Sequence, residues 1–206
     1  MATERLDLRR FREGDLDQLE GIFAKPEVWK FPYGRGLSRG ETEAFLSAQI
    51  AGWETHKFGC WLAIERKTRK AIGYIGLSIP TFLPEILPAV EVGWRLDPDV
   101  WGRGYATEGA KKALERGFEK LGLREICSVP QSGNAASERV CRRLGMRWRR
   151  TVRIPPNDRR GPLQAELYTL TMAEWAEGRL DSPPGRLRGT RHEMEGSSRR
   201  QHRKHE

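Results

Sequence analysis

Hydrophobic and polar residues alternate along one stretch near the middle of the chain and then change to a helical spacing. In residues 89–96, valine, tryptophan and leucine alternate with glutamate, glycine and arginine, which is the two-residue period of a β-strand. Asp97-Pro98 ends this strand. From Ala106 to Leu121, apolar residues recur every three or four positions with charged residues on the opposite face, which predicts an amphipathic helix. The pattern therefore predicts a strand, a short turn and a helix.

Similar patterns predict further elements on both sides of this stretch. Strands are expected at residues 5–11, 61–65, 71–78, 125–129, 147–154 and 163–170, and helices at 15–25, 38–53, 134–144 and from 171. Capping boxes are expected where a helix-starting residue is followed three positions later by Glu or Gln, namely at Asp15–Gln18, Ser38–Glu41 and Thr171–Glu174. Alternating strands and helices around a mixed sheet predict one α/β domain over residues 1–181.

Two stretches do not follow these patterns. Prolines at positions 80, 84 and 88 bound a short apolar segment, Thr81 to Leu87, and keep it out of the sheet interior. A lid, a dimer contact and a loop packed against the core all remain open for it. Residues 182–206 contain seven Lys or Arg, three Glu and almost no large apolar side chain, which predicts a disordered basic tail.

Composition narrows the class of protein without choosing a function. The chain has 206 residues, a net charge of +9 and a pI near 9.8, so phosphate-rich ligands and RNA are both attracted to it. Cys60, Cys127 and Cys141 are widely spaced in apolar surroundings, which indicates buried free thiols and a reducing cytoplasm. We expect neither a secretion signal nor a membrane span, because no apolar run is long enough for either.

The turn at residues 101–106 is the strongest candidate for chemistry. Its glycines precede a helix, where free backbone N–H groups and the helix dipole favour an anion, and Arg103 adds a cation. The dinucleotide fingerprint would need glycine at Thr107, and a P-loop would need Lys-Ser/Thr after Gly109. These two nucleotide-binding motifs are therefore excluded, while a backbone cradle for phosphate remains.

The sequence Trp101-Gly102-Arg103-Gly104-Tyr105-Ala106 resembles the acyl-CoA pyrophosphate loop of the GNAT N-acetyltransferases, whose motif is Gln/Arg-x-x-Gly-x-Gly/Ala. Trp101 replaces the Gln or Arg, and with Thr107 and Glu108 the segment is similar to the RimJ/RimL branch. The Asn134-x-x-Ser137 segment is also similar to the family. The resemblance covers residues 5–177 and implies the GNAT fold, an α/β domain whose mixed, mostly antiparallel sheet is splayed at the cofactor cleft and flanked by helices.

The resemblance also implies a cofactor site for acetyl-CoA and no metal. The expected cofactor-binding residues are Trp94, Arg95, Leu96, Gly102, Arg103, Gly104, Tyr105, Ala106, Thr107 and Asn134. In the family, the Asn contacts the pantetheine arm, and a backbone N–H of the strand at 92–96 receives the oxyanion.

Candidate catalytic residues follow from the chemistry of amine acylation. Glu91 lies on the strand leading into the loop, on the face opposite Val92, where a partly desolvated carboxylate can accept a proton through water; a solvated strand carboxylate is the alternative. The resemblance makes Ser137 the candidate acid for the departing thiolate, with Tyr168 a weaker one. Trp29, Phe31 and Tyr33 form either an acceptor-side wall, as in the family, or plugs of the core.

These observations predict an acetyl-CoA-dependent N-acetyltransferase that acts on a primary amine, with a protein N-terminal amine as the first candidate. A small-molecule or antibiotic acetyltransferase is one alternative, although a basic chain disfavours cationic acceptors. A non-catalytic acyl-CoA-binding or RNA-associated protein that uses its basic tail is another. We expect a cytoplasmic monomer or homodimer without membrane contact, with nucleic acid contact by the tail remaining open.

Overall fold

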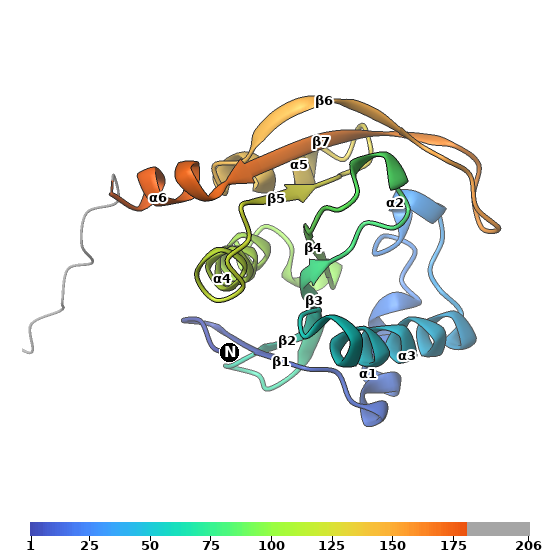
Figure 1. Ribbon diagram of the computed structural model, residues 1–206. Helices are drawn as coiled ribbons and strands as arrows, with labels where there is room; N and C mark the ends of the chain where they lie inside the picture. The colour runs from blue at the N-terminus through green and yellow to red at the C-terminus, as the bar shows by residue number, and fades with distance from the viewer. Residues whose placement is uncertain (181–206) are drawn as a thin grey trace, which may run out of the picture.

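The computed structural model describes residues 1–180, so the predicted tail at 182–206 lies outside the described residues (Figure 1). The strands are β1 (Leu6–Arg9), β2 (Cys60–Glu65), β3 (Ala71–Ser78), β4 (Glu91–Leu96), β5 (Glu125–Ser128), β6 (Arg147–Ile154) and β7 (Leu163–Thr171). The helices are α1 (Leu16–Phe23), α2 (Lys30–Tyr33), α3 (Arg39–His56), α4 (Tyr105–Glu119), α5 (Ala135–Arg143) and α6 (Met172–Leu180). Each predicted strand is present, and α2 is an addition.

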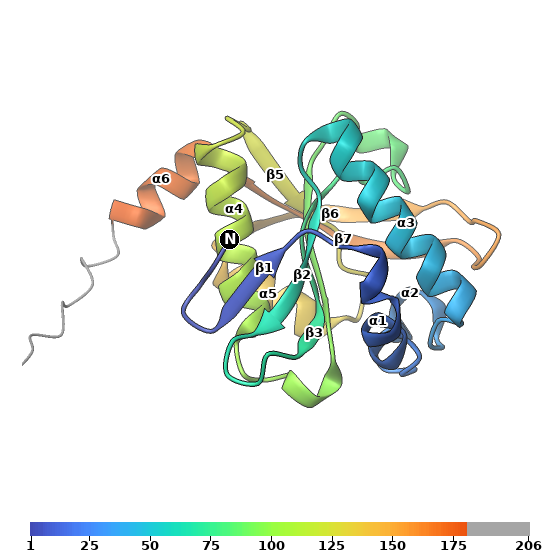
Figure 2. The ribbon, with the colours of Figure 1, turned by 90° about the horizontal axis from the view of Figure 1, so that it is seen from below.

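The seven strands form one sheet in the order β1-β2-β3-β4-β5-β7-β6. Every neighbouring pair is antiparallel except β4 and β5, which run parallel. Figure 2 shows α4 on one side of the sheet and α1 and α3 on the other. The structure therefore has the predicted mixed, mostly antiparallel sheet with helices on both faces.

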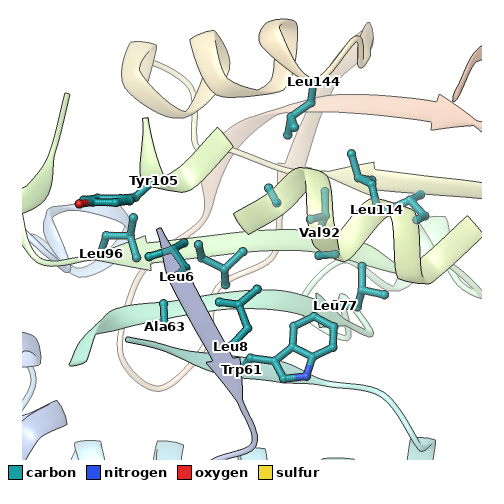
Figure 3. Close-up of a cluster of buried hydrophobic side chains, with 14 of the residues drawn as sticks. Leu6, Leu8, Trp61, Ala63, Leu77, Val92, Leu96, Tyr105, Leu114 and Leu144 are labelled. Carbon is teal, nitrogen blue, oxygen red and sulfur yellow. The ribbon is translucent and has the colours of Figure 1, made fainter. Parts of the chain in front are cut away.

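Two apolar layers hold the helices to the sheet. On one face, α4 presents Ala110, Ala113 and Leu114 to the inward side chains of β3 and β4, and Figure 3 shows Leu114, Leu77 and Val92 in this cluster. Burying such side chains contributes roughly 1.5–3 kcal/mol each. On the other face, α1 and α3 pack an aromatic-rich cluster against β2 and β3. These layers fix β4 in the middle of the molecule.

Two of the three expected capping boxes are present. The side chains of Ser38 and Glu41 each accept a hydrogen bond from the other's backbone N–H, and Thr171 and Glu174 do the same at α6. The prediction of a capping box at Asp15 and Gln18 is wrong, because the Asp15 side chain makes no cap hydrogen bond to α1. The Asp15 carboxylate is buried and accepts hydrogen bonds from the Arg9 guanidinium and the Arg12 N–H instead. A full ion pair outcompetes a weak cap at this position.

The proline-bounded segment packs against the core. Leu83 is 1% exposed and joins side chains of β5, β6 and β7, whereas Phe82 and Leu87 remain exposed. Glu85 pairs with Arg150 of β6 at 2.9 Å. Of the three alternatives, the structure shows the packed loop. Within residues 1–180, no helix combines the length and apolar character needed to cross a bilayer.

Candidate active site

The parallel strands β4 and β5 separate almost as soon as they meet. They share one register pair, Glu91 with Cys127, and the Cys127 N–H donates to the Val90 carbonyl at 2.9 Å. Two residues after Cys127, just past the end of β5, the Val129 N–H donates to the Glu91 Oε1 at 3.1 Å rather than to a backbone carbonyl of β4. Glu91 therefore stands where the two strands begin to diverge.

Beyond this point, one edge of β4 is open. β3 pairs with β4 along its full length, from Ser78 opposite Glu91 to Gly73 opposite Leu96. On the opposite edge, the described residues include no strand partner for positions 93–96. Backbone amides at such an edge seek another polar partner. The open edge is thus able to hydrogen-bond an extended ligand lying between β4 and β5.

Burial gives the Glu91 carboxyl an unusual proton affinity. The side chain is half-buried, and burial raises its pKa to about 7, against the opposing effects of the Val129 N–H and the Arg95 charge. A carboxyl with that pKa is about half ionised at neutral pH, so it is able both to take up and to release a proton. The sequence named this position, but its pKa depends on neighbours from other strands.

The glycine loop after β4 has the backbone that its sequence predicts. Gly102 and Gly104 have φ of 75° and 84°, and Gly104 precedes α4 without any side-chain cap. A side chain at Gly102 would meet no atom within 4 Å, and one at Gly104 would approach only the tip of Arg5. The loop is therefore unobstructed at these two glycines, at the positive end of the helix dipole, as an anion cradle requires.

An N-terminal brace supports this loop and was missed in the sequence. The Arg5 guanidinium donates to the Arg103 carbonyl at 2.8 Å and to the Glu108 carboxylate at 2.6 Å. Thr3 Oγ1 also donates to Glu108. Glu108 lies in the first turn of α4, where its negative charge would repel an anion in the cradle. The ion pair with Arg5 offsets that charge. A pairing across more than 100 residues leaves no local sequence signal.

Besides Arg95, whose side chain is described below, three of the predicted cofactor residues have side chains directed elsewhere. Tyr105 is buried, and its hydroxyl donates to the Glu65 carboxylate of β2. Leu96 is buried and Trp94 is half-buried, both in the cluster beneath α4. These residues are able to meet a ligand through their backbone only. Trp101, at the variable first position of the motif, is 52% exposed and donates its indole N–H to the Leu96 carbonyl at 2.8 Å.

Helix α5 begins close to the other wall of the split. Asn134 Oδ1 accepts a hydrogen bond from the Ser137 N–H at 3.2 Å, so Asn134 is the N-cap of α5 and keeps its amide NH₂ free of a partner within residues 1–180. The Ser137 hydroxyl is half-buried and likewise makes no hydrogen bond in this part of the chain. Tyr168 is buried, and its hydroxyl contacts Glu138 and Arg142.

The aromatic segment after α1 contributes to the core and to the surface. Trp29 is 7% exposed and stacks on Tyr33, with ring centroids 5.6 Å apart, while Phe31 and Tyr33 are half-buried. Arg95 reaches this segment from β4. Its Nη1 donates to the Val28 and Phe31 carbonyls at 2.5 and 2.7 Å, and its guanidinium lies 3.8 Å from the Trp29 ring centroid.

These contacts fix the aromatic segment over the face of β4 that carries Glu91. Arg95 and Glu91 share that face with Gly93 because side chains alternate along a strand. A side chain at Gly93 would meet no atom within 4 Å, so space is open between the two charged residues. The Lys25 ammonium also binds Asp97 at 2.7 Å, just beyond β4. The segment is therefore positioned as one wall of a space above Glu91.

The three cysteines are free and buried, as predicted. Burial raises the pKa of the Cys60 and Cys141 thiols to about 12 and that of Cys127 still further, with Glu91 adding to each shift. Protonated thiols are poor nucleophiles, so these cysteines are not suited to carry an acyl group. Within the described residues, no three His, Cys, Asp or Glu side chains are grouped as metal ligands.

Comparisons with known proteins agree with this geometry. A family profile described as "Acetyltransferase (GNAT) domain" matches residues 5–147. The uncharacterized N-acetyltransferase YnaD of Bacillus subtilis (strain 168) is 40% identical over 147 residues, which cover 71% of this chain and 82% of YnaD.

Two solved structures share the fold at low sequence identity. An acetyltransferase (GNAT family) from Bacillus anthracis has a TM-score of 0.69 and 21% identity, covering 84% of this chain and 98% of its own. RimL, a ribosomal L7/L12 alpha-N-protein acetyltransferase in complex with coenzyme A, has a TM-score of 0.68 and 17% identity, covering 83% and 96%.

Proposed function

The chain belongs to the GNAT family of acetyltransferases and is an acyltransferase, and from this premise we propose that it transfers the acetyl group of acetyl-CoA to a protein N-terminal amine. The GNAT family uses acetyl-CoA as its acyl donor. The observation that carries the proposal is the arrangement along β4. Glu91 lies at its start, an open edge follows, and the Gly102–Gly104 loop lies beyond its end.

Acetyl-CoA would occupy the split between β4 and β5. The backbone amides of residues 102–107 would hold the pyrophosphate, with Arg103 as an additional cation. The open edge would bond the pantetheine arm through the backbone of Trp94 and Leu96, because the Arg95 backbone faces β3. The free amide NH₂ of Asn134 would meet the arm from the α5 side. The six residues of β4 extend over about 17 Å, a span suited to a long, thin arm.

In the reaction that we propose, Glu91 takes a proton from the acceptor ammonium, directly or through a water molecule. The neutral amine then attacks the thioester carbonyl carbon, and a backbone N–H on the open edge of β4 stabilises the oxyanion. The attacking nitrogen then loses its second proton to solvent. When the carbon–sulfur bond breaks, Ser137 gives its hydroxyl proton to the thiolate and regains one from solvent. Holding both substrates side by side supplies much of the rate by itself.

The choice of acceptor rests on two observations. RimL, which shares the fold, is named as an acetyltransferase of a ribosomal protein N-terminus, in accord with the RimJ/RimL-like loop of this chain. The net charge of +9 disfavours cationic acceptors such as aminoglycosides. The half-buried side chains of Phe31 and Tyr33, with Trp29 behind them, would contact the first residues of the acceptor.

Thiol release from acetyl-CoA tests the acceptor. We expect release with peptides that carry a free N-terminus and none with the same peptides blocked at the N-terminus, even when they contain lysine. Polyamines and aminoglycosides serve as the small-amine arm, and Glu91→Gln serves as the control for uncatalysed transfer. Release with small amines alone would overturn the proposal of a protein acceptor, whereas the assignment of the chain as an acyltransferase would stand.

A further inference from the structure

The positive charge of the chain is concentrated in one short segment. Residues 135–160 contain nine arginines, no lysine and two acidic residues, so the segment carries 9 − 2 = +7. Residues 1–134 contain 20 basic and 19 acidic residues and carry only 20 − 19 = +1. The segment comprises α5, β6 and the start of the connection to β7. The fold therefore places most of the net charge at one side of the molecule.

The strand β6 presents this charge at the edge of the sheet. It is the last strand in the order, with β7 on one side and no strand of the described chain on the other (Figure 1). Residues 147–151 are exposed on both faces of the strand. Arg147 and Arg150 project from one face of the strand, and Trp148 and Arg153 from the other. We call the exposed side chains Arg147, Trp148, Arg149, Arg150 and Arg153 the β6 edge.

The nearby carboxylates neutralise these arginines only in part. Arg150 pairs with Glu85 at 2.9 Å. Arg147 and Arg149 share the single carboxylate of Glu174, at 2.9 and 3.7 Å. Arg153 of β6, like Arg139 and Arg143 of α5, is exposed and forms no ion pair within residues 1–180. Charge remains available for a partner.

Protection of an edge strand against aggregation does not account for this composition. A few charges suffice for that purpose, and lysine is the usual residue. Trp148 is also unsuited to such protection, since its indole is 54% exposed near the start of the edge strand. Its N–H donates to Glu166 at 2.8 Å, which fixes the ring and leaves its face available.

We propose that the β6 edge binds single-stranded nucleic acid. Guanidinium groups pair with phosphates in a bidentate manner, and both they and an exposed indole stack on unpaired bases. The exposed indole favours this partner over an acidic polypeptide, because guanidinium groups match carboxylates as well as phosphates, whereas an indole stacks on bases. β6 lies three strand spacings from β4, about 14 Å, so this surface is separate from the acyl-transfer site.

Binding of a short labelled oligoribonucleotide to the full chain tests the proposal, with the DNA oligonucleotide of the same sequence as a second arm. The test variant is Arg147→Gln/Arg150→Gln/Arg153→Gln, and the control is Lys67→Gln/Lys70→Gln/Lys120→Gln, which removes the same charge from exposed lysines elsewhere. At 0.1 M salt we expect the test variant to bind about 100-fold more weakly, and its log–log salt dependence to be shallower by about 2.

Trp148→Ala separates stacking from charge. We expect about tenfold weaker binding with an unchanged salt dependence, because the indole contacts bases and not phosphates. The Trp148→Ala variant also tests the proposal if the triple arginine variant is unfolded, which the melting temperature of the arginine variant would reveal. Preference between the RNA and DNA arms identifies the source of the strand. Equal losses in the arginine and lysine variants, or displacement of the oligonucleotide by an equal charge of polyglutamate, would overturn the proposal.

Discussion

Among single residues, Glu91 combines a position at the strand divergence with a pKa of about 7. If it is the base, kcat/KM of the wild type should rise with pH through about 7, as the carboxyl ionises. Glu91→Gln should lose this inflection and about 100-fold of its activity at pH 8, while an inflection from the amine acceptor near 8 remains. Steady-state kinetics across pH measure both. Retention of the inflection near 7 in the variant would remove Glu91 from the mechanism.

The same residue should also make the protein's stability depend on pH. Its folded-state pKa is raised, so the folded protein holds the proton more tightly than the unfolded chain does. Stability from this group is present below the ordinary pKa of 4.5 and is lost as pH rises through about 7. Glu91→Gln should therefore be more stable than the wild type at pH 8, by about 1–2 kcal/mol for a half-buried group, with little difference near pH 4.5. Urea unfolding at the two pH values decides; an equal difference at both would contradict the buried carboxyl.

The sequence predicted where Glu91 lies but not what its environment does to it. Alternation placed it on the face opposite Val92, whereas the Val129 N–H and Arg95 reach it through tertiary structure. Arg95 illustrates the same limit. It was expected at the cofactor, but its side chain binds the Val28 and Phe31 carbonyls and its backbone faces Tyr74 of β3, so neither is directed at the split.

At the scale of elements, the turn between β4 and α4 is expected to bind phosphate through its backbone. Gly104→Val should fill the open space above the loop and raise the dissociation constant for acetyl-CoA at least tenfold. Gly122→Val is the matched control, since Gly122 also has a positive φ and open space around it but lies beyond the far end of α4. It carries similar backbone strain. Equal affinity losses in the two variants would show that strain, and not the cradle, is responsible.

The start of α5 allows capping to be separated from ligand binding. Asn134→Ser keeps an oxygen that can accept from the Ser137 N–H, so stability should change little while acetyl-CoA affinity falls. Asn134→Ala should lose the affinity and, in addition, about 1 kcal/mol of stability. Thermal unfolding and calorimetry of the two variants give both quantities. Wild-type affinity in Asn134→Ser would leave Asn134 as a cap only.

Elements were predicted well where their signals are local. The loop, the caps at Ser38 and Asn134 and each strand follow from spacing and turn chemistry. The predicted cap at Asp15 is absent because Arg9, at the end of β1, binds that carboxylate. The brace from Arg5 to the loop was also not predictable, since the contact spans 98 residues.

For the whole molecule, function depends on strand order. The split exists because β5 pairs with β4 at one register position only, so no strand fills the rest of that edge of β4, while the other edge of β5 pairs with β7. Hydrophobic periodicity identifies strands but carries no information about which of them become neighbours. The resemblance to a family implied a mixed, mostly antiparallel sheet without giving its strand order, and the structure confirms the mixed sheet. The cofactor site itself stays a prediction built on this topology.

Calorimetric titration of the purified full chain with acetyl-CoA, beside NAD and ATP, tests the central claim most directly. If the split of β4 and β5 holds a pantetheine arm and the glycine loop holds its pyrophosphate, acetyl-CoA should bind at one site per chain. NAD and ATP offer phosphates without that arm and should bind much more weakly. Absence of acetyl-CoA binding, or equal binding of all three, would contradict the account.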